Sequence, residues 1–300
     1  MQTGDILKKF RKNRKMTQKE ICDGLITRQS YSKIENNLQQ PNYEILLAIL
    51  EKLDYEIDDF KNEMDKHTTI ENYYALLLKA KKNKASLKEI KELITYAQNN
   101  KYKNNTHFQL YGRIVGHFQK KYPSLISNYT KEDREYFKKF SSNYSTNYSL
   151  SDLKLLADLS THLLSYEEVY KIYKSLPNFN IFEYGKLSEI YSLQVHKIYN
   201  NYCDLALFNN DLKTAKEILE LHISFASYYP NLRYMLYIKI NEATLEYQET
   251  NDPLFLDELK RLANFTEELG DTISATSIFH QIEILKKNAS YKTTDIIVND

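Results

Sequence analysis

Residues 16–36 read MTQKEICDGLITRQSYSKIEN, and this stretch predicts two short helices joined by a tight turn. Thr17 can cap the first helix, and Glu20, three residues later, can return a hydrogen bond to the backbone of Thr17. That helix should end near Gly24, because glycine adopts a left-handed conformation at little cost. Thr27 can cap the second helix in the same way as Thr17 caps the first.

The second helix, residues 28–36, is expected to present polar side chains to a partner. Tyr31 and Ile34 recur at helical spacing and should face inward. The side chains expected on the outer face are those of Arg28, Gln29, Ser32 and Lys33. Arginine and lysine donate to the two acceptors of guanine, and glutamine pairs with adenine. The outer face therefore predicts contact with the base edges of double-stranded DNA.

Positive charge is concentrated around this stretch. Residues 1–40 carry nine lysines and arginines against four acidic residues, so the segment has a charge of about +5. Such charges bind phosphates and release condensed counterions, which favours nucleic acid as a partner. The less specific interpretations are a solvated basic helix and a small helical bundle without a DNA role. The capping pattern and the outward polar set agree with the charge, and together they favour DNA binding.

Apolar spacing predicts further helices on both sides of the quoted stretch. Ile6, Leu7 and Phe10 form one apolar stripe among basic residues, as expected of a helix that precedes it. After the stretch, helices are expected around residues 43–53 and 57–60, and their apolar faces can cover the core of a small helical unit.

Residues 7–60 resemble the lambda-repressor-type, or XRE-type, helix-turn-helix domain. The residues that carry the resemblance are Leu7, Phe10, Arg11, Thr17, Gln18, Glu20, Ile21, Cys22, Thr27, Gln29, Ser30, Ile34, Glu35, Asn36, Pro41, Leu53, Asp58, Asp59 and Phe60. The sequence departs from the family pattern in two places: the turn before the second helix is one residue shorter, and Asn37 stands where glycine is usual. The resemblance implies that Arg11 and Glu35 pair inside the domain.

The resemblance also implies roles at the DNA interface. The residues expected there are Gln18, Thr27, Arg28, Gln29, Ser30, Ser32, Lys33 and Asn36. Among them, Arg28, Gln29 and Lys33 would meet bases. Phosphates would be held by Gln18, Ser30 and Asn36.

Composition predicts that the whole chain is all-α. Six glycines and five prolines in 300 residues leave few helix breakers, and strand patterns are absent. Residues 45–50 are among the longest apolar runs, so no membrane span is expected. Residues 1–15 lack the apolar stretch of a signal peptide, so a cytoplasmic protein is expected. Cys22 and Cys203 match no disulfide or zinc spacing and should be small buried residues.

Amphipathic helices follow one another beyond residue 66. They are expected over residues 69–83, 86–99, 105–120, 131–140, 150–163, 166–175, 183–208, 211–227, 231–250, 253–269 and 271–288. Junctions with proline, glycine or asparagine, such as Pro177-Asn178, are expected to separate them. Similar junctions at residues 209–211 and 250–252 give a period of about 41 residues. This period is typical of stacked, tetratricopeptide-like helix pairs with a concave groove. Two domains are therefore predicted, residues 1–66 and residues 67–300.

A helix-turn-helix head followed by degenerate helical repeats resembles the Rgg-type regulators and related peptide-pheromone receptors of low-GC Gram-positive bacteria. In the second part, the segments that carry the resemblance are residues 165–169, 209–215 and 267–271. The resemblance implies a homodimer formed through the repeats. It also implies a short intracellular peptide in the concave groove, and quorum-sensing control of transcription.

Candidate peptide-binding residues follow from helix faces and side-chain type. They are His196, Asn200, Asn201, Arg233, Tyr237 and Asn241. An asparagine amide can grip a peptide backbone by both its donor and its acceptor, and an arginine can hold a carboxylate. The alternative is that these residues are capped or solvated helix positions.

Motifs of catalysis are absent from the sequence. No HExxH, Walker loop, GxSxG or GxGxxG occurs, and the seven histidines show no metal spacing, so no enzyme activity, metal or cofactor is predicted. Gly112 and Gly116 form a GxxxG pattern that indicates close helix packing. Two other functions stay open: a helical-repeat scaffold for a partner protein, and a phage-type repressor that needs no ligand.

Overall fold

The computed structural model describes residues 2–65, 69–141, 148–176, 179 and 187–287. All regular structure in these ranges is helical, as predicted. The chain divides into two compact units, Met1–Tyr96 and Ala97–Asp300. The first unit contains the predicted head. No helix within the described ranges has the length and apolar character that crossing a membrane requires.

Five helices form the head. They are α1 (Thr3–Asn13), α2 (Gln18–Cys22), α3 (Arg28–Glu35), α4 (Tyr43–Leu53) and α5 (Ile57–Asp65). The apolar stripe of α1 lies in one buried cluster with Tyr31 and Ile34 of α3, as the helical spacing predicted. Helix α5 is longer than predicted and continues past the buried Phe60, where Glu63 pairs with Lys9 of α1 at 2.7 Å.

The predicted caps set the ends of α2 and α3. The backbone N–H of Glu20 donates to Thr17 Oγ1 (3.3 Å), and that of Thr17 donates to Glu20 Oε2 (2.6 Å), which completes the capping box. Gly24 has φ of +71°, the left-handed conformation predicted for the end of this segment. Thr27 Oγ1 accepts from the backbone N–H of Ser30 at 3.1 Å and so begins α3. These local bonds fix where α3 starts.

Helices α6 (Thr69–Lys81) and α7 (Leu87–Asn100) follow the head along the chain. The remaining helices are α8 (Asn105–Phe118), α9 (Lys131–Ser141), α10 (Leu150–Leu163), α11 (Tyr166–Ser175), α13 (Glu189–Phe208), α14 (Leu212–Tyr228), α15 (Leu232–Thr250), α16 (Pro253–Glu268) and α17 (Thr272–Lys286). These bounds agree with the predicted ones to within a few residues. The helix predicted to start at residue 183 begins only at Glu189, because Ser188 is extended and caps it, so that predicted start is wrong. The break at Pro177-Asn178 and residue 288 lie outside the described residues.

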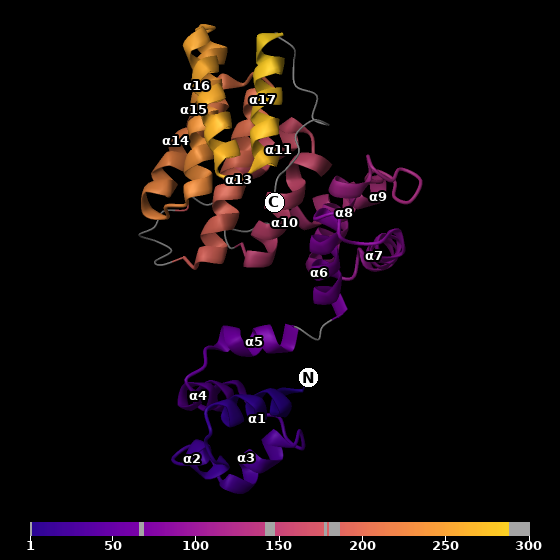
Figure 1. Cartoon of the computed structure of the whole chain (residues 1–300), viewed down its shortest axis with the longest axis vertical. Coiled ribbons are helices and arrows are strands. Elements are labelled where there is room, and N and C mark those ends of the chain that lie inside the picture. Colours follow the sequence, from indigo (N-terminus) through magenta and orange to yellow (C-terminus); the bar gives the residue numbers. More distant parts are fainter. Residues whose placement is uncertain (1, 66–68, 142–147, 177–178, 180–186, 288–300) are drawn as a thin grey trace. The chain divides into compact units, whose positions relative to one another are not determined.

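The second unit is built from helices that pack on their neighbours along the chain. Helices α13 to α17 stand side by side, each in contact with the next (Figure 1). A second set of contacts skips a helix: α8 packs on α10, α10 on α13, and α13 on α15. We call α8, α10, α13, α15 and α17 the helix row. This double pattern of contacts is that of stacked helix pairs.

Close packing between α8 and α10 depends on a glycine. A Cβ at Gly112 would lie 2.2 Å from the side chain of Leu159, so a larger residue there would force Leu159 to shift. A Cβ at Gly116 would have no neighbouring atom of the described residues within 4 Å. The close packing predicted from the GxxxG pattern is therefore confirmed at its first glycine only. Both cysteines are buried, also as predicted.

Candidate DNA-binding surface and ligand-binding row

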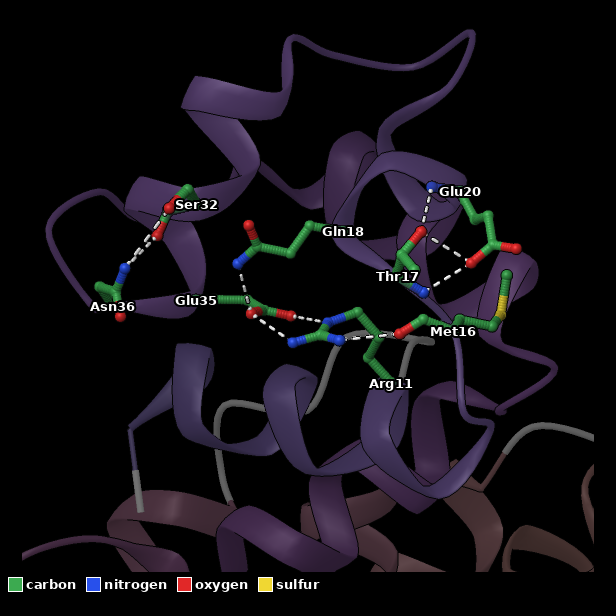
Figure 2. Close-up of polar contacts among 8 residues, drawn as sticks. All are labelled: Arg11, Met16, Thr17, Gln18, Glu20, Ser32, Glu35 and Asn36. Carbon is green, nitrogen blue, oxygen red and sulfur yellow. Dashed lines mark hydrogen bonds and ion pairs between the residues drawn. The ribbon is translucent and has the colours of Figure 1, made fainter.

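A buried ion pair holds α3 against α1 (Figure 2). Arg11 Nε donates to Glu35 Oε1 at 2.5 Å, and Arg11 Nη2 donates to Glu35 Oε2 at 3.0 Å. Gln18 Nε2 of α2 donates to the same carboxylate at 2.8 Å, so Glu35 joins three helices. Burial alone would raise the pKa of Glu35, but the hydrogen bonds from Arg11 and Gln18 hold it below its usual range. The pairing of Arg11 with Glu35 is confirmed.

The outer side of α3 forms an open hollow of about 400 Å³. It is lined by Gln18, Arg28, Gln29, Ser32, Lys33, Asn36 and Leu38. Six of the eight residues predicted at the DNA interface are thus brought together here. The other two, Thr27 and Ser30, lie at the start of α3 with their hydroxyls 2.9 Å apart. Leu38 was not predicted at this surface.

The hollow offers donors that the domain itself does not use. Arg28, Gln29 and Lys33 are exposed, and their side chains make no hydrogen bond or ion pair within the described part of the chain. By contrast, Asn36 Nδ2 donates to the carbonyl oxygen of Ser32 (2.9 Å), which fixes its amide at the end of α3 (Figure 2). The surface therefore combines fixed polar groups with free cationic donors, which suits a polyanion.

Polar contacts run along the helix row of the second unit, beginning at Asp158 of α10. Arg113 Nε of α8 and Lys197 Nζ of α13 each donate to its carboxylate at 2.8 Å. Gln109 Nε2 of α8 donates to the same group at 2.5 Å. Asn201 of α13 donates from Nδ2 to the carbonyl oxygen of Ala157 at 2.8 Å. Three helices of the row are thereby linked through their polar faces.

The next polar contacts along the helix row surround Asp204 of α13. Asn200 Nδ2 donates to Asp204 Oδ2 at 3.0 Å, and Asn241 Nδ2 of α15 donates to Asn200 Oδ1 at 3.3 Å. Burial raises the pKa of Asp204 to about 7, although Asn241 and Asn200 donate hydrogen bonds that favour its charged form.

Contacts between α15 and α17 complete the row. The hydroxyls of Tyr237 and Ser274 lie 3.3 Å apart, and Gln281 Nε2 donates to Thr244 Oγ1 at 2.7 Å. Arg233 is half exposed and lies 3.8 Å from Asp271. Of the residues predicted to bind a ligand, Asn200, Asn201, Tyr237 and Asn241 make contacts within this row.

His196 has a different place from the other predicted ligand-binding residues. It is fully buried, and its Nε2 donates to the carbonyl oxygen of Tyr229 at 2.7 Å. Because that nitrogen carries the proton, Nδ1 accepts from His222 Nε2 at 3.0 Å. His222 Nδ1 is then unprotonated, and it has no hydrogen-bond partner among the residues that the structure describes. Burial and the neighbouring His196 lower the pKa of His222 to about 3. Both nitrogens of His196 are thus used within the fold.

Sequence reasoning missed Arg113, Asp158, Lys197 and Asp204. A periodic signal for them does exist, because the residues that bond across the row are separated by about one repeat. The separation is 39 residues for Lys197 with Asp158, 41 for Asn241 with Asn200, and 37 for Gln281 with Thr244. Polar residues spaced by the period of about 41 residues would have pointed to this row.

The comparisons with known proteins agree with this architecture. A helix-turn-helix family model matches residues 7–60, so the head is a DNA-binding domain of that type. No curated protein matches the chain. A solved variant of PrgX is 16% identical, with a TM-score of 0.74 over 99% of this chain and 100% of that one.

Two further solved structures share the fold. One, described as a bacterial peptide pheromone–receptor complex, is 16% identical with a TM-score of 0.72 and covers 95% of this chain and 98% of its own. The other is the SHP pheromone receptor Rgg2 of Streptococcus dysgalactiae, 12% identical with a TM-score of 0.70 over 94% and 99% of the two chains. The predicted fold and the full-length resemblance to Rgg-type regulators are confirmed.

Proposed function

We propose that this chain is a sequence-specific transcription regulator that binds double-stranded DNA through α3 and is controlled by a short peptide bound along the helix row. We further propose that it acts as a homodimer in the cytoplasm. The observation that carries the proposal is the hollow on α3. It gathers unpaired cationic and amide donors on a helix-turn-helix head, and the remaining fold is shared with a peptide pheromone receptor.

Base recognition is assigned to three exposed side chains of α3. Arg28 and Lys33 can donate to guanine, and Gln29 can pair with adenine because its amide both donates and accepts a hydrogen bond. Phosphates are assigned to Gln18 and Asn36, whose amides are already held by Glu35 and Ser32. Thr27, Ser30 and Ser32 supply hydroxyls around the same helix.

Peptide binding is assigned to the amides and hydroxyls of the helix row. Asn200 and Asn241 are buried in this structure, at 9% and 2% exposed. Together with Asn201 they can hold a peptide backbone once the contact between α13 and α15 opens and they exchange the hydrogen bonds they now make with each other and with Ala157. Tyr237 and Arg233 extend this surface over α15, and Arg233 can hold a carboxylate because its contact with Asp271 is long. His196 is left out of the proposed contacts because its ring nitrogens are already bonded.

Two assays on the full chain test the proposal. Selection from a random duplex library should enrich one sequence, and the affinity for that sequence should fall steeply with salt because phosphate contacts release counterions. In a thermal-shift screen, some short apolar peptides should raise the Tm of the chain, and Asn241→Ala should abolish that rise. The control is Gln98→Ala, which truncates an exposed amide side chain of α7 and should leave the rise in Tm unchanged.

The outcomes separate the competing functions. A chain that enriches a DNA sequence but responds to no peptide is a ligand-independent repressor. A chain that enriches no DNA sequence and captures a protein partner through its repeats is a scaffold. Either result contradicts the proposal.

A further inference from the structure

An exposed leucine stands among the polar residues of the DNA-facing hollow. Leu38 follows α3 in the chain, is 77% exposed and lines the same hollow as Lys33 and Asn36. An apolar side chain with so much exposed surface is unfavourable in water, and the other residues that line the hollow are all polar or charged. Leu38 therefore differs in chemistry from every neighbour on this surface.

The backbone around Leu38 is held rigidly. Its N–H donates to the carbonyl oxygen of Lys33 at 2.8 Å, and the N–H of Asn37 donates to that of Ile34 at 3.0 Å. These two bonds form a Schellman motif, in which Asn37 takes the left-handed position with φ of +58°. A Schellman motif fixes the residue that follows the left-handed one, which here is Leu38.

Asn37 also anchors this turn to the first helix. Its Oδ1 accepts from the backbone N–H of Gly4 at 2.8 Å, and its Nδ2 donates to Asp5 Oδ1 at 3.2 Å. Glycine, the usual residue of the family at this place, has no side chain that can make these bonds. Asn37 therefore joins the turn to α1, and the position of Leu38 relative to α3 is set by both helices.

The usual apolar partner of Leu38 is missing. In a Schellman motif, the residue at the position of Leu38 commonly makes a hydrophobic contact with a residue in the last turn of the helix. In this chain Lys33 stands in that last turn, and its side chain is exposed and charged. The motif thus presents a fixed apolar group outward, beside side chains that suit DNA.

We infer that Leu38 is a specificity-determining residue that contacts the 5-methyl group of a thymine next to the bases met by α3. Among the base edges of the major groove, the thymine methyl is the apolar feature, and apolar side chains recognise it by contact. The inference rests on the proposed DNA-binding function. It adds a base preference that hydrogen-bonding side chains alone do not provide.

The test begins with the full chain and a random duplex library. The wild-type chain, Leu38→Ala and the control Leu254→Ala, which truncates an exposed leucine of α16, are selected in parallel. Wild type and control should enrich a thymine at one position that becomes degenerate with Leu38→Ala, while the remaining positions keep their preferences. Leu38→Met, which retains an apolar side chain, should restore the thymine.

The second step removes only the methyl group. Replacing that thymine by deoxyuridine should weaken wild-type binding about fourfold, the effect expected for losing one buried methyl group. Leu38→Ala should bind the two duplexes equally.

Two results would overturn the inference. Unchanged base preferences with Leu38→Ala, or an equal response of wild type and variant to deoxyuridine, would show that Leu38 contacts the sugar–phosphate backbone or nothing, and the proposed function would stand. A wild-type chain that enriches no sequence would refute the proposed function, and the inference with it.

Discussion

Glu35 determines how α3 is presented by the head. It is 1% exposed and accepts hydrogen bonds from Arg11 and Gln18, so its charge is fully compensated inside the domain. The side chains that would meet bases lie on the same helix. A change at Glu35 should therefore affect DNA binding although the residue itself is not exposed.

Loss of the Arg11–Glu35 pair should destabilise the head. Glu35→Gln leaves the guanidinium of Arg11 without its charged partner, and breaking a buried pair in this way costs about 3 kcal/mol. Hydrogen exchange of the α1 and α3 amides in the full chain measures the effect. Asp54→Asn, which breaks the exposed pair with Arg14, is the control and should change exchange little. Unaltered exchange in Glu35→Gln would rule out a stabilising pair.

Replacement of a base-reading side chain should lower specific affinity. Gln29→Ala should weaken binding to the selected DNA site by about 1–3 kcal/mol and relax the base preference at one position. The loss should be smaller on unrelated DNA, because phosphate contacts persist. Titration of both duplexes with the full chain measures the difference, with Gln98→Ala as control. Equal losses on both duplexes would place Gln29 away from the bases.

Pairs of helices in the second unit are joined by titratable groups with opposite pH responses. His196 and His222 join α13 to α14 and are neutral when folded. Asp204 lies in the contact between α13 and α15 and holds its proton up to about pH 7. Because the two groups lie on different helix contacts, single substitutions can separate their contributions.

Acid should weaken the contact between α13 and α14. The pKa of His222 is lowered to about 3 in the folded chain, so below the usual range near 6.5 the unfolded chain binds a proton that the folded chain does not. The contribution of His222 to the free energy of unfolding is therefore fully present above pH 6.5, and it falls as the pH decreases from there toward 3. His222→Gln should flatten the change in Tm between pH 7.5 and 5.5, whereas the exposed His280→Gln should not. An identical pH profile for both variants would contradict this assignment.

Asp204 should have the opposite effect. Its folded pKa of about 7 lies above the usual range near 3.8, so the folded chain keeps a proton that the unfolded chain has lost. The contribution of Asp204 to the free energy of unfolding thus falls as the pH rises from about 4 to 7. Asp204→Asn should raise Tm at pH 8 and raise it less at pH 5, and the exposed Asp257→Asn is the control. A lower Tm at both pH values would show that the carboxylate has a charged partner.

Dimer formation and DNA reading are expected in different parts of the molecule. A head of about sixty residues buries little apolar surface and has little to spare for a stable dimer. Helical repeats have long faces, and the described part of the second unit exposes large apolar residues such as Leu232, Leu269 and Ile273. Two heads held by paired repeats can meet half-sites about 34 Å apart. A peptide that favours one arrangement of the repeats would then change DNA affinity.

Removal of the head should leave dimerisation and ligand binding intact. Residues 67–300 should sediment as a dimer and should bind the peptide found in the thermal-shift screen as tightly as the full chain does. Circular dichroism establishes that the fragment is folded. A folded fragment that is monomeric and binds no peptide would assign these tasks to the head instead.

The sequence alone predicted the features that depend on neighbouring residues. The caps at Thr17 and Thr27 and the outward face of α3 follow from spacings of three or four residues, and the left-handed Gly24 follows from the residue type. The all-helical fold followed from the scarcity of glycine and proline. The pairing of Arg11 with Glu35 came from family resemblance rather than from spacing.

Tertiary structure decided the features that depend on helices meeting across the chain. It placed His196 in a buried pair, brought Lys197 to Asp158 from 39 residues away, and put Leu38 in the hollow on α3. A helical pattern indicates which face of a helix is apolar, but it does not identify the helix that packs against that face. Hydrogen-bond partners across the repeats, and the exposure of a residue in a turn, therefore become known only when the helices are packed.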